Sequence, residues 1–124
     1  MKAIFLVAIG GAIGSVLRYL VALFMKNIYV GQFPWNTFTV NIMGCLVIGF
    51  ILSWSLQNSP FENIQLFLMV GILGGFTTFS SFGLETFNLI KQRQFLLSIT
   101  YIFASNSFGI LAVYIGYTFH KFLG

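Results

Sequence analysis

Four apolar stretches, each long enough to cross a bilayer as a helix, constrain the fold of this 124-residue chain more than any other feature. A helix needs about 20 apolar residues to span the hydrocarbon core. We expect helices at about residues 3–25, 36–56, 64–89 and 95–122, with short polar or proline-marked loops at 26–34, 57–63 and 91–94 between them. The sequence therefore predicts an all-α integral membrane protein with one transmembrane domain, residues 1–124.

The small number of charged residues excludes several classes of function. Only 6% of the residues are charged, and 58% are hydrophobic, which suits lipid rather than water as the surrounding solvent. The cations stand singly, so no basic patch for nucleic acid is present. The chain has no Asp and two Glu, and it lacks a carboxylate pair, a phosphate loop and a metal-spaced His/Cys set. We expect neither an enzyme nor a nucleic-acid partner.

The flanking charges are almost balanced across the membrane. Lys2 and Lys121 lie on the side of the two termini (side one), whereas Lys26, Lys91 and Arg93 lie on the side of the first and third loops (side two). Topology is fixed by a clear excess of Lys and Arg on the cytoplasmic side. Two interpretations stay open: insertion in both orientations, which would allow an antiparallel dimer, or a weak bias that makes side two cytoplasmic.

The third span contains a segment that disfavours a regular helix. Residues 71–83 read GILGGFTTFSSFG, with four glycines, two threonines and two serines. In lipid a broken helix is tolerated only where protein or a water-filled cavity satisfies the freed backbone groups, and freed carbonyls are natural cation ligands. The other interpretation is that Gly71, Gly74 and Gly75 only allow neighbouring helices to pack closely. The hydroxyl cluster after these glycines favours a functional break.

Two groups of side chains in the spans are candidates for an ion path. Thr37, Asn41 and Gly44 form a thin polar stripe on one helix face, which we expect to contact protein or to line a pore. Phe79 and Phe82 share a face inside the hydroxyl-rich segment, and most phenylalanines in such a chain face lipid or pack. Aromatic ring edges carry partial positive charge and can border an anion. The neighbouring threonine and serine hydroxyls add O–H donors.

Two charged residues have more than one possible role. Arg18 is a cation within the first span, and it either extends to side two or attracts anions into a vestibule. Glu85 follows the predicted break by about a turn, and it is either a residue at a pore mouth or a helix-end charge.

Three segments resemble the Fluc/CrcB family of fluoride channels: IGGAIGSVLRY (9–19), TFTVNIMGCLVIG (37–49) and GILGGFTTFSSFGLE (71–85). The resemblance covers nearly the whole chain, and GGFTTFSSF is its most specific part. It implies a bacterial inner-membrane protein that exports fluoride passively and thereby relieves fluoride toxicity. It also implies an antiparallel, dual-topology dimer with a second copy or a related chain, two fluoride pores and a central structural sodium ion.

The resemblance also implies roles for individual residues. Phe79 and Phe82 match the phenylalanines whose ring edges line the fluoride path, Asn41 matches a donor to fluoride, and Ser80 matches the hydroxyl between the phenylalanines. The other matches are Gly74 and Thr77 to the sodium-binding backbone carbonyls, Arg18 to the vestibule arginine and Glu85 to the acid that follows the phenylalanine pair.

The fourth span departs from the family pattern. Aligned on Gly109, Ile110 and Tyr114 stand where the family often has Ser and Thr, whereas a shift of one residue makes Ser105, Asn106 and Ser107 nearer candidates. We therefore expect no particular residue of this span in the path.

Two other classes of membrane protein compete with the channel hypothesis. A small dual-topology multidrug exporter would need an acidic residue within the first span, and residues 3–25 contain none. A non-transporting scaffold with glycine-packed helices would leave the Thr/Ser/Phe cluster without a purpose.

Overall fold

The computed structural model describes residues 1–58 and 62–123 as an all-helical chain. Four helical segments are long and apolar enough to cross a membrane: α1 (Lys2–Ile28), α2 (Trp35–Asn58), a composite third segment (Glu62–Lys91) and α6 (Phe95–Leu123). Their ends differ from the predicted ones by less than one helical turn, and the predicted four-helix membrane architecture is confirmed. The second loop, predicted around Pro60, lies outside the described residues.

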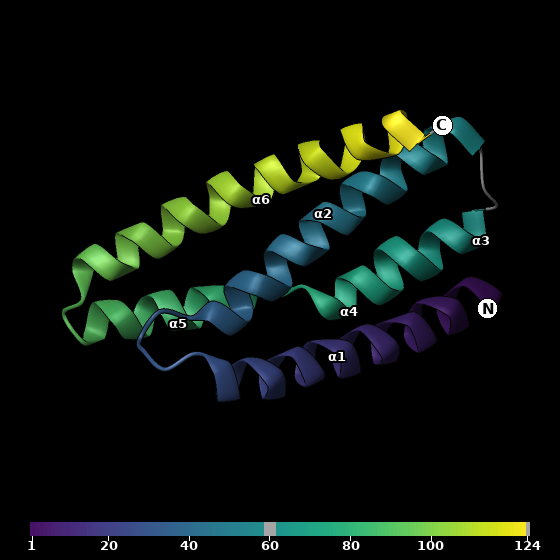
Figure 1. Cartoon of the computed structure of the whole chain (residues 1–124). Coiled ribbons are helices and arrows are strands. Elements are labelled where there is room, and N and C mark those ends of the chain that lie inside the picture. Colours follow the sequence, from purple (N-terminus) through teal and green to yellow (C-terminus); the bar gives the residue numbers. More distant parts are fainter. Residues whose placement is uncertain (59–61, 124) are drawn as a thin grey trace.

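The third segment is interrupted, as predicted, and it consists of four helical pieces (Figure 1). These are α3 (Glu62–Gln65), the π-helical η1 (Leu66–Leu73), α4 (Gly74–Phe76) and α5 (Phe79–Lys91). The residues that leave the helix are Thr77, with φ −82° and ψ 158°, and Thr78, with φ −151° and ψ 120°. The glycines before them stay helical, so the threonines form the break.

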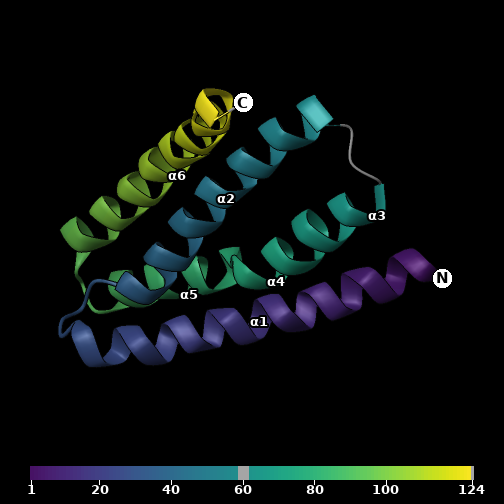
Figure 2. The same cartoon turned by 45° about the vertical axis from the view of Figure 1, so that its right-hand side comes forward.

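The helices form two closely packed pairs. α1 runs along η1 and α4, and α2 runs along α6, as Figure 2 shows. Both termini lie at the same end of the molecule, opposite the α1–α2 and α5–α6 loops (Figure 1). α5 contacts α6, so the second half of the third segment lies beside the α2–α6 pair. The break at Thr77 and Thr78 thus carries the chain from one helix pair to the other.

Glycines allow α1 to approach the third segment very closely. A Cβ atom on Gly14 would lie 2.0 Å from the Ile72 carbonyl oxygen, and one on Gly75 would lie 2.4 Å from the Gly11 carbonyl oxygen. Both distances are too short for any side chain, and small residues serve this purpose in membrane helix interfaces. Gly71 and Gly75 therefore allow close helix packing, which was one of the two interpretations of these glycines, and the helix break follows them in the chain.

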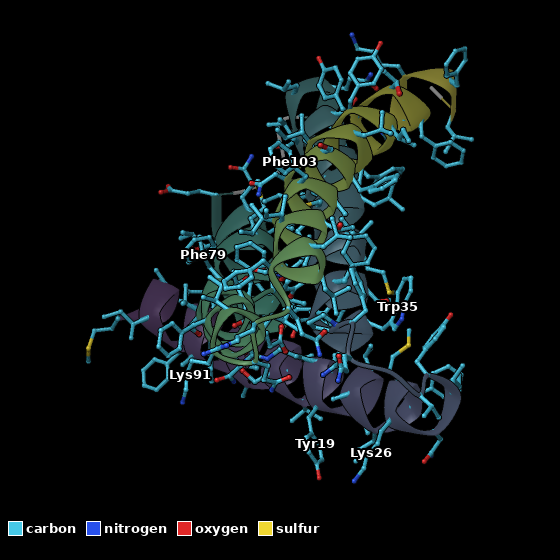
Figure 3. The ribbon with its side chains drawn as sticks, turned by 90° about the vertical axis from the view of Figure 1, so that its left-hand side faces the viewer. Tyr19, Lys26, Trp35, Phe79, Lys91 and Phe103 are labelled. Atoms are coloured by element: carbon cyan, nitrogen blue, oxygen red, sulfur yellow. The ribbon has the colours of Figure 1, made fainter. Side chains whose placement is uncertain are left out.

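The outer surface is strongly apolar. Phe5, Phe24 and Phe122 are 63%, 65% and 90% exposed, which is expected where lipid replaces water as the solvent. Lys26 and Lys91 lie at the end of the molecule that carries the first and third loops (Figure 3). The chain is therefore a multi-pass membrane protein whose apolar helix surfaces end in charged residues.

Candidate functional site

The break in the third segment is stabilised by its own hydroxyl groups. Thr78 caps the N-terminus of α5, and its Oγ1 accepts a hydrogen bond from the Ser81 backbone N–H at 3.2 Å. Threonine and serine are preferred at this position because their side-chain oxygens satisfy free amides of the first turn. On the other side of the break, the Thr77 amide and hydroxyl both donate to the Leu73 carbonyl, at 3.0 and 2.9 Å. The Thr-Thr pair thus ends one helix and begins the next.

Asn41 on α2 holds the break from the neighbouring helix pair. Its Oδ1 accepts from the Thr78 backbone N–H at 2.8 Å, and its Nδ2 donates to the Thr78 carbonyl at 3.0 Å. The amide side chain therefore pairs with the backbone of a single residue, which fixes the plane of the amide. An Asn side chain has a second N–H on Nδ2. Neither of these two bonds uses the second N–H, and Asn41 also lines the groove described below.

The backbone carbonyls of Gly74 and Thr77 are among those that lose their helical donors at the break. The Thr78 N–H donates to Asn41 and not to the Gly74 carbonyl, which lies four residues earlier. The Ser81 N–H donates to Thr78 Oγ1 and not to the Thr77 carbonyl. A freed carbonyl in the middle of a membrane needs another partner. Gly74 and Thr77 are the residues whose carbonyls the sequence analysis expected to bind a cation.

Arg18 on α1 supplies a partner for one of these carbonyls. Its Nη1 donates to the Thr77 carbonyl oxygen at 3.3 Å, and the side chain is half-buried. The guanidinium thus lies against the break rather than only extending toward side two. Its other N–H groups stay available for an anion or for water.

An open groove of about 420 Å³ runs along the break, and residues of α2, the third segment and α6 line it. Its polar wall combines Asn41, Thr77 and Thr78 with Ser105 and Asn106 of α6, and its aromatic wall is formed by the rings of Phe79 and Phe82. The ring centroids of the two phenylalanines are 5.5 Å apart at an interplanar angle of 42°. Phe79 is 82% exposed and projects from the start of α5 (Figure 3). The groove therefore brings polar side chains beside two aromatic rings, and it is open on one side.

The comparisons with known proteins show the family of this chain. Residues 5–117 match the family model described as CrcB-like protein, Camphor Resistance (CrcB). The chain belongs to the CrcB family. This confirms the family inferred from the three sequence segments.

CrcB relatives match the chain over nearly its whole length. A protein of Azobacteroides pseudotrichonymphae is 44% identical over 123 residues, which cover 98% of both chains. One from Helicobacter pylori strain G27 is 43% identical over 124 residues, 98% of this chain and 95% of its own. One from Helicobacter acinonychis is 40% identical, with 98% of both chains covered. Each carries the name "Fluoride-specific ion channel FluC".

The structure brings five of the eight predicted site residues of this CrcB protein to the groove, and the exceptions are Arg18, Ser80 and Glu85. Asn41, Gly74, Thr77, Phe79 and Phe82 line the groove. Ser80 does not: its side chain is exposed, and its Oγ lies 3.3 Å from Thr78 Oγ1. Glu85 lies further along α5, away from the groove lining.

Glu85, itself half-buried, belongs to a hydrogen-bonded cluster that the sequence did not indicate. Its Oε1 accepts from the Thr37 hydroxyl at 2.7 Å, and its Oε2 accepts from the Tyr101 hydroxyl at 2.8 Å. Thr37 is 3% exposed and Tyr101 is 0% exposed. The ring of Tyr101 also lies 5.0 Å from that of Phe82, so the cluster supports the aromatic wall of the groove. A tyrosine hydroxyl within an apolar span was the signal that could have indicated Tyr101.

The fourth helix contributes residues that the family alignment left open. Ser105 and Asn106 line the groove, whereas Ile110 and Tyr114 line a separate apolar hollow and are 74% and 64% exposed. The Ser105 hydroxyl is buried and has no partner among residues 1–58 and 62–123.

Replacing Tyr101 by Phe should destabilise the protein measurably. The change leaves the half-buried Glu85 carboxylate with one donor fewer, and hydrogen bonds to charged groups contribute about 1.5–3 kcal/mol. The free energy of unfolding in detergent should fall by about that amount. Tyr19→Phe is the matched control, because Tyr19 is 63% exposed, and exposed substitutions change stability by about 0.5 kcal/mol or less. Equal effects of the two changes would contradict the role of the cluster.

Proposed function

We propose that this CrcB protein forms a fluoride-selective channel that lets fluoride leave the cytoplasm passively and so relieves fluoride toxicity. The observation that carries the proposal is the groove in which the Asn41 amide and the Ser105 hydroxyl lie beside the rings of Phe79 and Phe82. Relatives that are 40–44% identical over nearly the whole chain are named fluoride-specific ion channels. The protein transports an ion and is not an enzyme.

The chemistry of the groove suits a small, strongly hydrated anion. Fluoride is a strong hydrogen-bond acceptor, so a narrow path must replace its water shell with donors. Amide and hydroxyl donors and the positive edges of aromatic rings provide this without a full positive charge, which would bind the ion too tightly to release it. Arg18, on the far side of the break, then acts as the cation that attracts anions toward the path.

The open side of the groove supports assembly with a second chain. Phe79 is 82% exposed, although it belongs to the wall of the proposed path, so a partner is needed to enclose it. Flanking charges of two cations on side one and three on side two suit insertion in both orientations. We therefore propose an antiparallel, dual-topology dimer with a second copy or a related chain, which encloses two fluoride pores. Its place would be the bacterial inner membrane, in contact with lipid, since the similar proteins are bacterial.

The freed carbonyls of the break suit a structural sodium ion at the centre of such a dimer. Gly74 and Thr77 lose their helical donors, and a Cβ atom on Gly74 would meet nothing closer than 3.9 Å, so this backbone is open to a ligand. Carbonyl oxygens are suitable ligands for a hard monovalent cation. Bound sodium would supply charge that holds the two breaks together, with the carbonyls of both subunits as ligands.

Substitutions in the groove should reduce fluoride transport selectively. Phe82→Ile keeps much of the side-chain volume but removes the positive ring edge. Asn41→Asp replaces an N–H donor by an anion, which repels both fluoride and the Thr78 carbonyl. We expect initial fluoride efflux from liposomes to fall by about tenfold or more, since roughly 1.4 kcal/mol of added barrier suffices for that.

Phe5→Leu and Phe24→Leu are the matched controls, because both rings are exposed on α1, far from the groove lining. Their fluoride efflux per folded dimer, with the dimer verified by size-exclusion chromatography, should equal that of the parent. If Phe82→Ile and Asn41→Asp also transport like the parent, the proposed path is wrong.

Cysteine labelling tests the dual topology. Gln32→Cys in the first loop and Gln57→Cys at the opposite end of α2 leave the flanking charges unchanged, with Cys45 replaced by Ser in both variants. In intact cells a membrane-impermeant maleimide should label a fraction of each variant, and permeabilisation should expose the rest. Labelling of only one of the two sites, together with full activity of this chain alone, would exclude dual topology.

A further inference from the structure

The Thr77 carbonyl has two candidate partners, and both are cations. In the structure it accepts a hydrogen bond from the Arg18 guanidinium at 3.3 Å. In the proposed dimer the same oxygen is a ligand of sodium. A carbonyl oxygen has two lone pairs, so geometry alone allows both contacts. Electrostatics opposes them, because two positive charges on one oxygen repel strongly where water is excluded.

The packing of α1 places Arg18 close to the break. Gly14, one turn before Arg18, brings α1 so close to the third segment that a Cβ atom there would lie 2.8 Å from the Phe76 backbone nitrogen. The guanidinium is thereby held beside the residue that follows Phe76. A chain without sodium thus keeps a partner for a carbonyl that lipid cannot satisfy.

We infer that Arg18 is a tethered cation that competes with sodium for the Thr77 carbonyl and so sets the sodium affinity of the break. The inference rests on the proposed sodium site. Sodium binding weakens the Arg18–Thr77 hydrogen bond, and the freed guanidinium N–H groups then face the anions that approach the path. By thermodynamic linkage, sodium binding weakens the Arg18–Thr77 hydrogen bond by the same free energy by which that hydrogen bond weakens sodium binding.

Sodium titration of purified dimers tests the competition. The measurement is thermal stability against sodium concentration at constant ionic strength, with a large organic cation as the replacement ion. Arg18→Gln removes the competing charge and should lower the sodium midpoint by about tenfold, within the usual range of coupling between two sites. Lys26→Gln removes one charge from the same helix at an exposed position and should leave the midpoint unchanged.

A second measurement needs no change at Arg18. The chain has two arginines, Arg18 and Arg93, so arginine-selective ¹⁵N labelling gives two side-chain Nε signals. The Arg18 signal should shift with sodium at the same midpoint as the thermal stabilisation, whereas the signal of Arg93 in the third loop should stay constant. This readout applies even if Arg18→Gln does not fold.

The outcomes separate this inference from the proposals on which it rests. In one outcome sodium stabilises the protein while Arg18→Gln has the same sodium midpoint as the parent, or while the Arg18 Nε signal does not shift with sodium. Either result overturns the inference but leaves the proposed sodium site intact. Absence of any sodium effect in the parent overturns the sodium site and the inference together. Fluoride efflux, measured separately, tests the channel itself.

Discussion

The paired hydrogen bonds between Asn41 and the backbone of Thr78 are the interaction on which the rest of the structure depends. In lipid an interrupted helix must find partners for the backbone groups that it frees. Asn41 provides them from another helix pair, and it does so for both polar groups of one residue. Without this contact, the Thr78 amide would return to the Gly74 carbonyl, and the third segment would continue as an ordinary helix.

The consequences of this contact extend across the groove. The break lets α5 begin in a new direction with Phe79 in its first turn, so the rings of Phe79 and Phe82 lie beside the Asn41 amide. It also frees the carbonyls of Gly74 and Thr77, and Arg18 binds one of these. The two aromatic rings of the groove and the freed carbonyls beside it thus arise from one local event in the chain.

The sequence predicted the features that local composition controls. Four apolar spans follow from hydropathy alone, and a Thr-Thr-Phe-Ser-Ser cluster indicated an interrupted third span. The stripe of Thr37, Asn41 and Gly44 was expected to face protein or a pore, and it faces the third segment. Thr37 contacts Glu85, Asn41 contacts Thr78, and Gly44 makes room for the Thr77 methyl group.

Features that depend on how distant segments meet could not be predicted. The glycines suggested the place of the break, yet Gly71 and Gly75 pack against α1 within helical turns, and the threonines leave the helix instead. The Glu85–Tyr101 hydrogen bond requires the packing of α5 on α6, which no local pattern encodes. Which residues of α6 reach the groove depends on the rotation of that helix about its axis. The family alignment did not decide this, and the structure places Ser105 and Asn106 there.

The most direct test of the account is the ion selectivity and driving force of transport by the purified protein. Liposomes loaded with fluoride or with chloride would be diluted into ion-free buffer, with and without an imposed proton gradient. The account predicts rapid fluoride efflux that is independent of the proton gradient, and hardly any chloride efflux, because the groove offers donors and ring edges but no membrane-embedded acid in α1 to carry protons. Fluoride efflux that strictly requires a proton gradient, or chloride efflux as fast as that of fluoride, would contradict it.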